Sequence, residues 1–194
     1  MELILFDFDG TLTKKDSFIE FIAYYKGRIK LYTGFLVRII DLSLFFLGLI
    51  SNTRFKEIML SHFFREESVS NFNKTGEEFA LRIIPGILRD GALETIKKHS
   101  AEGNRMIVVT ASCSNWIKAW TDKMGLELIA TELEEVNGKI SGKISGKNCY
   151  GSEKVIRIKS YVDLDYFDSI IAYGDSDGDR QMLDLADVKN YRAI

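Results

Sequence analysis

Three short apolar segments in different parts of the chain each end in a cluster of polar residues, and this pattern limits the fold more than any other feature. The segments are LILF at 3–6, RMIVVT at 105–110 and SIIAYG at 169–174. Short apolar runs that are partly β-branched and are followed by turn or polar residues are typical of buried strands. We therefore predict that these three segments form a central parallel sheet.

The segments near these strands have the spacing of helices and of a further hairpin. Residues 91–104 and 114–125 are expected to be helices, and 126–131 is a candidate for another core strand. Residues 132–144 alternate around Asn137-Gly138, which is a strong two-residue turn signal and indicates a peripheral hairpin. Because helices alternate with strands, we predict an α/β fold with a doubly wound parallel sheet.

A helical insertion separates the first strand from the second. Residues 16–84 have helical periodicity and almost no strand character; Asp16 fits the N-cap of the first helix, and Pro85-Gly86 returns the chain to the core. A chain of 194 residues has room for one sizeable core and a smaller inserted unit. We predict a core formed by 1–15 and 85–194, with a helical cap at 16–84.

The cap contains an apolar segment, 31–50, whose length approaches that of a membrane span. Arg38 and Asp41 lie in its middle, and each such charge costs roughly 2.5 to 3.5 kcal/mol on insertion into a bilayer. The uninterrupted part, 42–50, is too short to cross a membrane. We predict a buried helix pair here, and a membrane-contacting surface is the alternative.

Charge and cysteine content exclude several classes of protein. A net charge of -2 gives no basic surface for nucleic-acid phosphates. Cys113 and Cys149 fit neither a disulfide framework nor a paired zinc motif. The N-terminal residues lack the basic start and apolar run of a signal peptide. We therefore expect a cytoplasmic protein with no nucleic-acid partner.

Polar side chains follow each predicted strand, at the edge where doubly wound sheets bind their ligands. A carboxylate beside an apolar strand costs free energy unless it is paired or binds a metal, so two of them at the end of the first strand indicate a site. The residues that follow the strands or open the next helix are Asp7, Asp9, Thr110, Ala111, Ser112, Lys154, Asp175 and Asp179. If the strands are parallel, these side chains converge on one crevice.

This set of side chains suits phosphoryl transfer. Asp7 is ionised at neutral pH, so it is able to attack phosphorus without a general base and form an aspartyl-phosphate. Asp7, the backbone carbonyl of Asp9 and Asp175 offer hard oxygen ligands for one magnesium ion. Lys154 and the Thr110 hydroxyl are predicted to hold the phosphate oxygens. Asp9 is predicted to protonate the leaving alcohol and then to activate water.

Further residues are expected around these reacting groups. Those predicted to bind substrate are Gly10, Asp16, Thr110, Ala111, Ser112 and Lys154. Asp179 is expected to hold Lys154 or a metal-bound water rather than to bind the metal directly. Arg54 and Lys56 in the cap are expected to be solvated helix charges, with contact to a substrate anion as the alternative.

Four motifs carry a resemblance to a known family. DFDGTLT, VVTAS, the lysine of CYGSEK and GDSDGD resemble, in this order, the motifs of the haloacid dehalogenase superfamily, and they frame nearly the whole chain. The resemblance implies a Rossmann-like core and a magnesium-dependent aspartyl nucleophile, and an aspartate two residues after the nucleophile is the pattern of the family's phosphatases. The cap, the hairpin and C-x-G-x-x-K are similar to subfamily IB, which includes phosphoserine phosphatase, and to relatives that include phosphatidylglycerophosphatase-type enzymes.

Two positions bear on the substrate. Phosphoserine phosphatases typically have Asn where this chain has Gly178, and a glutamate that meets the substrate amine where this chain has Asp16. Asp16 fits either a helix N-cap or an amine contact. We predict hydrolysis of a small phosphate ester such as phosphoserine or a related amino-alcohol phosphate. The alternative is a lipid-phosphate phosphatase at a membrane surface, with Phe35, Phe45 and Phe46 touching acyl chains.

Two other classes of function are disfavoured. A phospho-accepting signalling domain uses similar residues, but receiver domains accept phosphate after a later strand and have no helical insertion. A catalytically inactive binding module is disfavoured because every catalytic position is filled.

Overall fold

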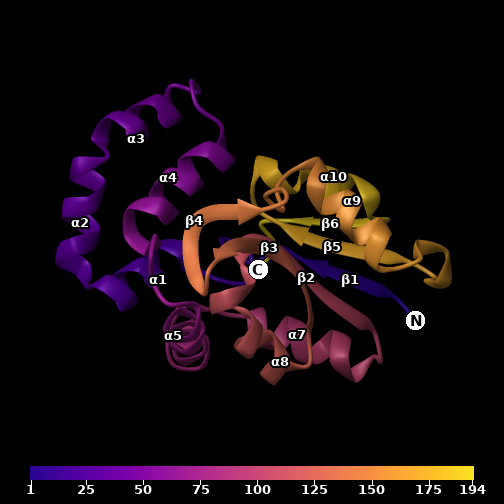
Figure 1. Cartoon of the computed structure of the whole chain (residues 1–194). Helices are drawn as coiled ribbons and strands as arrows, with labels where there is room; N and C mark the ends of the chain where they lie inside the picture. Colours follow the sequence, from indigo (N-terminus) through magenta and orange to yellow (C-terminus); the bar gives the residue numbers. More distant parts are fainter.

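A six-stranded sheet runs through the molecule in the computed structural model, which describes residues 1–194 (Figure 1). Across the sheet the strands follow the order β4-β3-β2-β1-β5-β6, and every neighbouring pair is parallel except β3 and β4. The strands are β1 (Leu3–Phe6), β2 (Arg105–Cys113), β3 (Glu127–Val136), β4 (Lys139–Ser145), β5 (Ile170–Gly174) and β6 (Val188–Tyr191). The predicted α/β fold with a largely parallel sheet is confirmed.

Strand β1 lies at the centre of the sheet, between β2 and β5. All four of its residues are fully buried, which explains its uninterrupted apolar sequence, since a parallel strand is covered on both faces. Leu5 lies opposite Ile107 in β2 and Ala172 in β5. This register brings the carboxyl ends of the three strands to the same edge.

Helices cover both faces of the sheet. Ile4 and Phe6 point into a core shared with α7, α8 and the inserted helices, whereas Leu3 and Leu5 point into a second core with α9 and α10. The helices are α1 (Ser17–Lys26), α2 (Arg28–Val37), α3 (Ile39–Phe46), α4 (Asn52–Phe64), α5 (Val69–Arg82), α6 (Ile84–Ile87), α7 (Ala92–Ala101), α8 (Lys118–Met124), α9 (Ser152–Tyr161) and α10 (Arg180–Leu185), with short 3-10 turns η1 (Ser114–Trp116), η2 (Leu164–Tyr166) and η3 (Asp177–Asp179).

The helices α1 to α5 fall within the range predicted for the cap. Part of this unit shares a core with the sheet, because Phe21 of α1 stacks on Trp116 of η1 with ring centroids 5.0 Å apart, and it also contacts Phe64, Phe72 and Phe79. Helix α5 packs against η1 and α8. The division into a core and a cap with the bounds given above stays a prediction.

The prediction of a buried helix pair at 31–50 is wrong. Only Leu31 and Gly34 of α2 are buried, and no residue of α3 is. In Figure 1 these two helices lie on the side of the cap away from the sheet. An apolar sequence alone does not determine which of its side chains pack against the rest of the chain. In α2 and α3, most of the apolar side chains are not packed in this way. No helix combines the length and apolar character that a membrane span requires.

Three other details differ from the sequence prediction. Strand β3 continues from the core into the hairpin as one strand, and the β3–β4 turn at Asn137 and Gly138 has positive φ at both residues, as a primed turn requires. The hairpin is not isolated, since β4 packs against α4 and the Ser61 hydroxyl donates to the Gly142 carbonyl at 3.1 Å. Strand β6 was not predicted.

A glycine at the interface between α5 and η1 provides a test of this packing. A Cβ atom on Gly76 would collide with the backbone carbonyl of Asn115, whereas a Cβ on the exposed helical Gly86 would meet nothing. We expect Gly76→Ala to lower the free energy of unfolding by about 1 to 3 kcal/mol through overpacking. Gly86→Ala is expected to leave it unchanged or raise it by up to about 1 kcal/mol. Urea denaturation measures both, and equal stability of the two variants would contradict the close approach of α5 to η1.

Candidate active site

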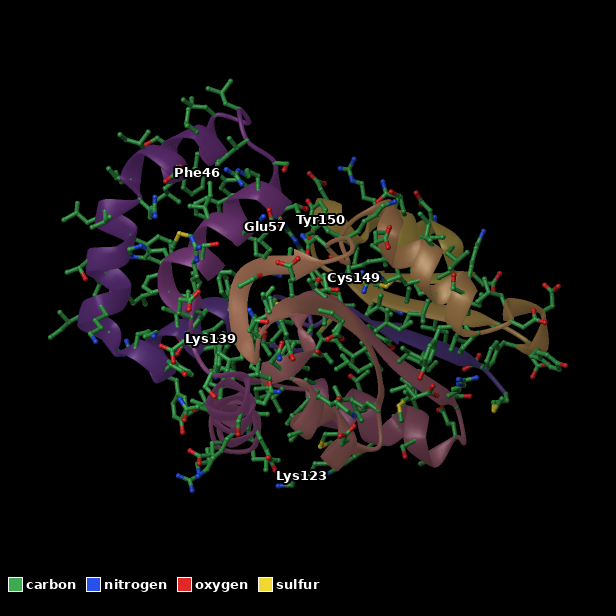
Figure 2. The ribbon with its side chains drawn as sticks, viewed as in Figure 1. Phe46, Glu57, Lys123, Lys139, Cys149 and Tyr150 are labelled. Atoms are coloured by element: carbon green, nitrogen blue, oxygen red, sulfur yellow. The ribbon has the colours of Figure 1, made fainter.

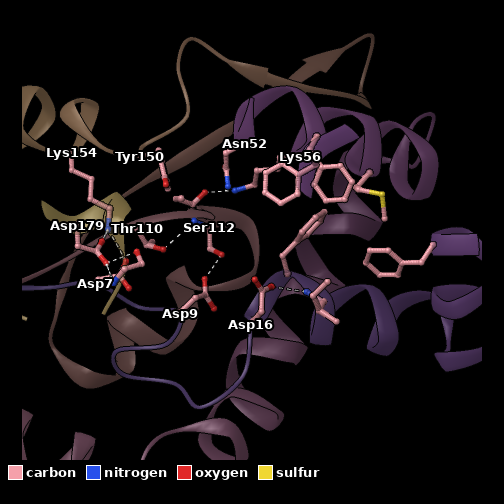
Figure 3. A pocket seen from close by; sticks show the side chains of 18 residues that line it. Asp7, Asp9, Asp16, Asn52, Lys56, Thr110, Ser112, Tyr150, Lys154 and Asp179 are labelled. Atoms are coloured by element: carbon pink, nitrogen blue, oxygen red, sulfur yellow. Dashed lines mark hydrogen bonds and ion pairs between the residues drawn. The ribbon is translucent and has the colours of Figure 1, made fainter. Parts of the chain in front are cut away.

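The carboxyl ends of β1, β2 and β5 meet beside the inserted helices, and a cavity of about 400 Å³ lies there (Figure 3). Asp7 and Asp9 come directly after β1, and Asp175 comes directly after β5. Thr110 and Ser112 lie within β2 rather than after it, because this strand extends to Cys113. The convergence predicted from the sequence is present in the structure, and the roles assigned to these residues stay predictions.

Lys154 is the most constrained side chain of the site. It lies in the first turn of α9 and is 1% exposed. Its ammonium group donates to the carboxylates of Asp7 at 2.6 Å and Asp179 at 2.7 Å, and to the backbone carbonyl of Val109 at 2.8 Å. Burial alone would lower the pKa of Lys154, but the two carboxylates outweigh burial and raise it. All three donors of the ammonium are therefore used, and its position is fixed.

Asp7 is a buried carboxylate with two different partners. Its Oδ1 atom accepts from Lys154, and its Oδ2 atom accepts from the Thr11 hydroxyl at 3.2 Å. Burial raises the pKa of Asp7 to about 6, against the lowering effect of Lys154. The group is therefore mainly ionised at neutral pH, as an attacking carboxylate must be.

Asp9 is held by a network that reaches into the first inserted helix. Its Oδ2 atom accepts from the Ser112 hydroxyl at 2.5 Å, and its Oδ1 atom accepts from the backbone N–H of Ser17 at 2.6 Å. The indole N–H of Trp116 donates to the Ser17 hydroxyl at 3.2 Å. Burial and the nearby Asp16 raise the pKa of Asp9 to about 7. Ser17 and Trp116 were not predicted as site residues, because neither belongs to a recognisable motif.

Two of the three aspartates of the fourth motif, Asp175 and Asp179, have different surroundings. Asp179 uses Oδ1 for Lys154, and its Oδ2 accepts from the backbone N–H and the hydroxyl of Ser176 at 3.0 and 2.7 Å. Burial would raise the pKa of Asp179, but Lys154 outweighs burial and lowers it. Asp175 is half-buried, and its Oδ1 has only the Thr11 hydroxyl at 3.4 Å. Both oxygens of Asp179 are therefore occupied, whereas Asp175 has oxygen atoms available for another partner.

The carboxylates at this edge fit a magnesium ion. One carboxylate oxygen from each of Asp7, Asp175 and Asp179 lies within 4.8 Å of the others. Both oxygens of Asp179 are already hydrogen-bonded, so Asp7 and Asp175 are the side chains of this group that offer magnesium the hard oxygens it prefers. Gly10 is adjacent, with φ +89°, and a Cβ atom there would collide with the carboxylate of Asp175. The Arg89 side chain donates to the Gly10 carbonyl at 2.7 Å. Only glycine therefore fits at position 10 beside Asp175. Asp175 lies close to Asp7 but is not one of the residues that line the cavity.

The rest of the cavity is formed mainly by apolar side chains of the inserted helices. These are Phe18, Ile19, Phe35, Phe45, Phe55 and Met59. Two charged groups lie among them. Asp16 accepts from the backbone N–H of Ile19 at 2.9 Å and also lines the cavity, so it is an N-cap that faces the site. Lys56 is buried and donates to the Ala111 carbonyl, so the expectation of a solvated charge is wrong for Lys56, whereas Arg54 is exposed.

The glycine at 178 has a steric explanation. A Cβ atom on Gly178 would collide with the ring of Tyr150, and Tyr150 lines the cavity. The aromatic ring occupies the space that a larger residue at 178 would need. The position of the Tyr150 ring therefore explains why this chain has glycine at 178, where phosphoserine phosphatases typically have Asn.

Comparison with known proteins agrees with this geometry. The sequence pattern of the haloacid dehalogenase-like hydrolases matches residues 4–184. The chain belongs to this family. Protein CicA of Caulobacter vibrioides is 32% identical to this chain over 192 residues, which are 98% of this chain and 85% of that protein. A phosphoserine phosphatase of Archaeoglobus fulgidus is 28% identical over 102 residues, which are 51% of this chain and 30% of that protein.

A crystal structure is also similar over most of the chain. It is that of a protein with unknown function from Bordetella pertussis Tohama I, with a TM-score of 0.79 and 26% identity, covering 95% of this chain and 86% of that one. The prediction of a phosphatase of the haloacid dehalogenase superfamily, similar to phosphoserine phosphatase, is confirmed. The substrate, the metal and the covalent intermediate stay predictions.

The Lys154 cluster gives a test of stability that does not depend on turnover. In EDTA-containing buffer, we expect Lys154→Met to lower the free energy of unfolding by about 3 to 5 kcal/mol, because Asp7 and Asp179 are left buried without a cation. Lys147→Met is the control, since the Lys147 side chain is 76% exposed and its ion pair with Glu153 is long, at 3.8 Å; it is expected to cost less than about 1 kcal/mol. Urea denaturation followed by circular dichroism compares the two. Losses of equal size would contradict the structural importance of the cluster.

Proposed function

We propose that this haloacid dehalogenase-like protein is a magnesium-dependent phosphomonoester hydrolase that acts through an aspartyl-phosphate on Asp7. The observation that carries the proposal is the arrangement around Asp7, whose carboxylate lines the cavity and is oriented by Lys154 and Thr11. Asp175 lies close enough to share a metal with it. A buried nucleophile and a fixed cation in one cavity, with the available oxygens of Asp175 close to the nucleophile, support this chemistry better than any other.

The residues of the chain account for each bond that changes. A carboxylate oxygen of Asp7 bonds to phosphorus as the bond from phosphorus to the leaving oxygen breaks, and Asp9 donates a proton to that oxygen. Asp9 then takes a proton from water, which attacks the acyl-phosphate and releases phosphate and free Asp7. The Thr110 hydroxyl holds a phosphate oxygen throughout, and Lys154 exchanges its bond to Asp7 for one to a phosphate oxygen as Asp7 is phosphorylated. Magnesium, when held by Asp7, Asp175 and the Asp9 carbonyl, offsets the repulsion between two anions.

The roles of the two aspartates are separable by substitution. With p-nitrophenyl phosphate and magnesium, we expect Asp7→Asn to reduce turnover to background, because an amide is neither an anionic nucleophile nor an equivalent ligand. Asp9→Asn is expected to lower kcat by about 10²- to 10⁴-fold and to leave the magnesium dependence largely intact, since the metal contact runs through its backbone. Asp177→Asn is the control, because its side chain is 78% exposed.

Two outcomes would contradict these assignments. If the Asp7→Asn variant hydrolysed p-nitrophenyl phosphate at the full rate, Asp7 would be excluded as the nucleophile. Loss of magnesium affinity in Asp9→Asn would mean that the Asp9 side chain binds the metal. Beryllium fluoride with magnesium is expected to inhibit by mimicking the phosphorylated Asp7, and EDTA is expected to abolish activity.

For the substrate, we propose a small phosphate ester with an amine, such as phosphoserine or a related amino-alcohol phosphate. Asp16 is an acid on the cavity wall, and Lys56 is a cation on the same side, so the cavity offers one partner for an amine and one for a carboxylate. The relationship to a phosphoserine phosphatase adds support. A lipid phosphate is the second candidate, because six apolar side chains of the inserted helices line the same cavity.

One substitution separates the two functions of Asp16. Asn is as good an N-cap as Asp, so Asp16→Asn keeps the bond to Ile19 and removes the charge. We expect it to raise KM for phosphoserine about 10- to 150-fold, because a hydrogen bond to a charged group contributes about 1.5 to 3 kcal/mol. Turnover of p-nitrophenyl phosphate is expected to change far less than KM for phosphoserine, with its pH profile moved to lower pH, because the Asp16 charge helps to raise the pKa of Asp9. Activity confined to phosphatidyl substrates in a panel of phosphate esters would reject the amine and favour the lipid.

A further inference from the structure

Helices α2 and α3 and the turn after them carry an unusual concentration of exposed apolar side chains. Nine of the nineteen exposed large hydrophobic residues of the chain lie between positions 29 and 49. Seven of them, each between 68 and 80% exposed, define the outer cap face: Ile29, Leu36, Val37, Ile40, Phe46, Leu47 and Leu49. Single exposed apolar residues are normal, but a group of this size on two adjacent helices indicates an interaction surface.

Nothing in the chain covers this face. In Figure 1, α2 and α3 lie on the side of the cap away from the sheet, and Phe46 of α3, which Figure 2 labels, is 78% exposed. Phe45 stacks on Phe55 of α4 with ring centroids 4.7 Å apart. Because α3 has no buried residue, packing within the chain does not explain the other apolar side chains of this helix.

The charges around the outer cap face define the kind of partner. Residues 26–50 contain four basic residues and one acidic residue, whereas the whole chain has a net charge of -2. Two of the four are paired, Lys26 with Glu67 and Arg38 with Asp41. The other two, Arg28 and Lys30, are exposed beside Ile29 at the start of α2. A second copy of the chain docked on this face would bring one positively charged border close to another, which is unfavourable. An apolar surface with a basic border instead complements an anionic lipid bilayer.

We propose that the outer cap face docks on the surface of an anionic lipid bilayer, with α2 and α3 lying in the plane of the interface. This is contact with one leaflet and not a membrane span. The same helices also line the cavity, since Phe35 and Phe45 face it while their neighbours Leu36 and Phe46 are exposed. The docking surface and the apolar wall of the cavity are therefore opposite sides of one pair of helices.

Vesicle sedimentation tests the docking surface. The probes are vesicles of phosphatidylglycerol and phosphatidylcholine in equal parts, and vesicles of phosphatidylcholine alone. We expect the full chain to bind the anionic vesicles, and the double variant Leu36→Glu/Phe46→Glu to bind them at least about tenfold more weakly, because two apolar side chains no longer enter the interface. Tyr166→Glu is the matched control, since Tyr166 is 81% exposed but lies outside the cap; its binding is expected to be unchanged.

The basic border is tested separately. Arg28→Gln/Lys30→Gln is expected to weaken binding to anionic vesicles about fivefold per charge, and added salt is expected to weaken binding by the unaltered chain. All variants alter exposed residues outside the cavity lining, so p-nitrophenyl phosphate turnover is expected to be unchanged and reports correct folding.

Three results would overturn the proposal. The first is that the unaltered chain does not bind anionic vesicles. The second is that the Leu36→Glu/Phe46→Glu variant binds them as tightly as the unaltered chain. The third is that the unaltered chain binds no vesicles but forms a concentration-dependent dimer in analytical ultracentrifugation, and that this variant does not form the dimer. The last result would assign the outer cap face to a second copy. The docking proposal and the proposed function are tested independently. If the unaltered chain binds vesicles but does not hydrolyse p-nitrophenyl phosphate, only the proposed function is contradicted.

Discussion

The site depends on one buried cation, the ammonium group of Lys154. It contacts the end of β1 through Asp7, the middle of β2 through the Val109 carbonyl, and the turn after β5 through Asp179. Asp7 lies 147 positions away along the chain and Asp179 lies 25 away. A charge so deeply buried is tolerated only with full pairing, so the edge of the sheet must close around Lys154 for the fold to be stable. The same requirement brings the reacting groups together.

The two ends of the cavity are built in different ways. At the sheet edge, polar side chains are fixed by hydrogen bonds to one another, and this rigidity suits the phosphate group, which all phosphomonoesters share. On the cap side, phenylalanine rings and Met59 form most of the wall, with Asp16 and Lys56 as the charged exceptions. In the proposed function, the polar end carries out the reaction and the largely apolar end selects the leaving group.

The sequence was most informative where function depends on strand ends. Asp7, Thr110 and Asp175 were found because each follows or ends an apolar run, and parallel strands align those positions. Strand β6 was missed because VKNY is polar and largely exposed. Lys56 was misjudged because its burial depends on the approach of α4 to the end of β2, which no local pattern encodes. For the same reason, the apolar composition of 31–50 did not predict that α3 would pack so little.

The first turn of α1 connects the cap to the chemistry. Its backbone N–H groups at Ser17 and Ile19 donate to the carboxylates of Asp9 and Asp16. Free N–H groups and the helix dipole both favour negative charge at this end of a helix, so the two aspartates stabilise the start of α1 as well as facing the cavity. The side chain proposed to move protons therefore also fixes where the cap begins. A displacement of α1 would remove one of the two hydrogen bonds that hold Asp9, and the position of the cap and the orientation of Asp9 are consequently coupled.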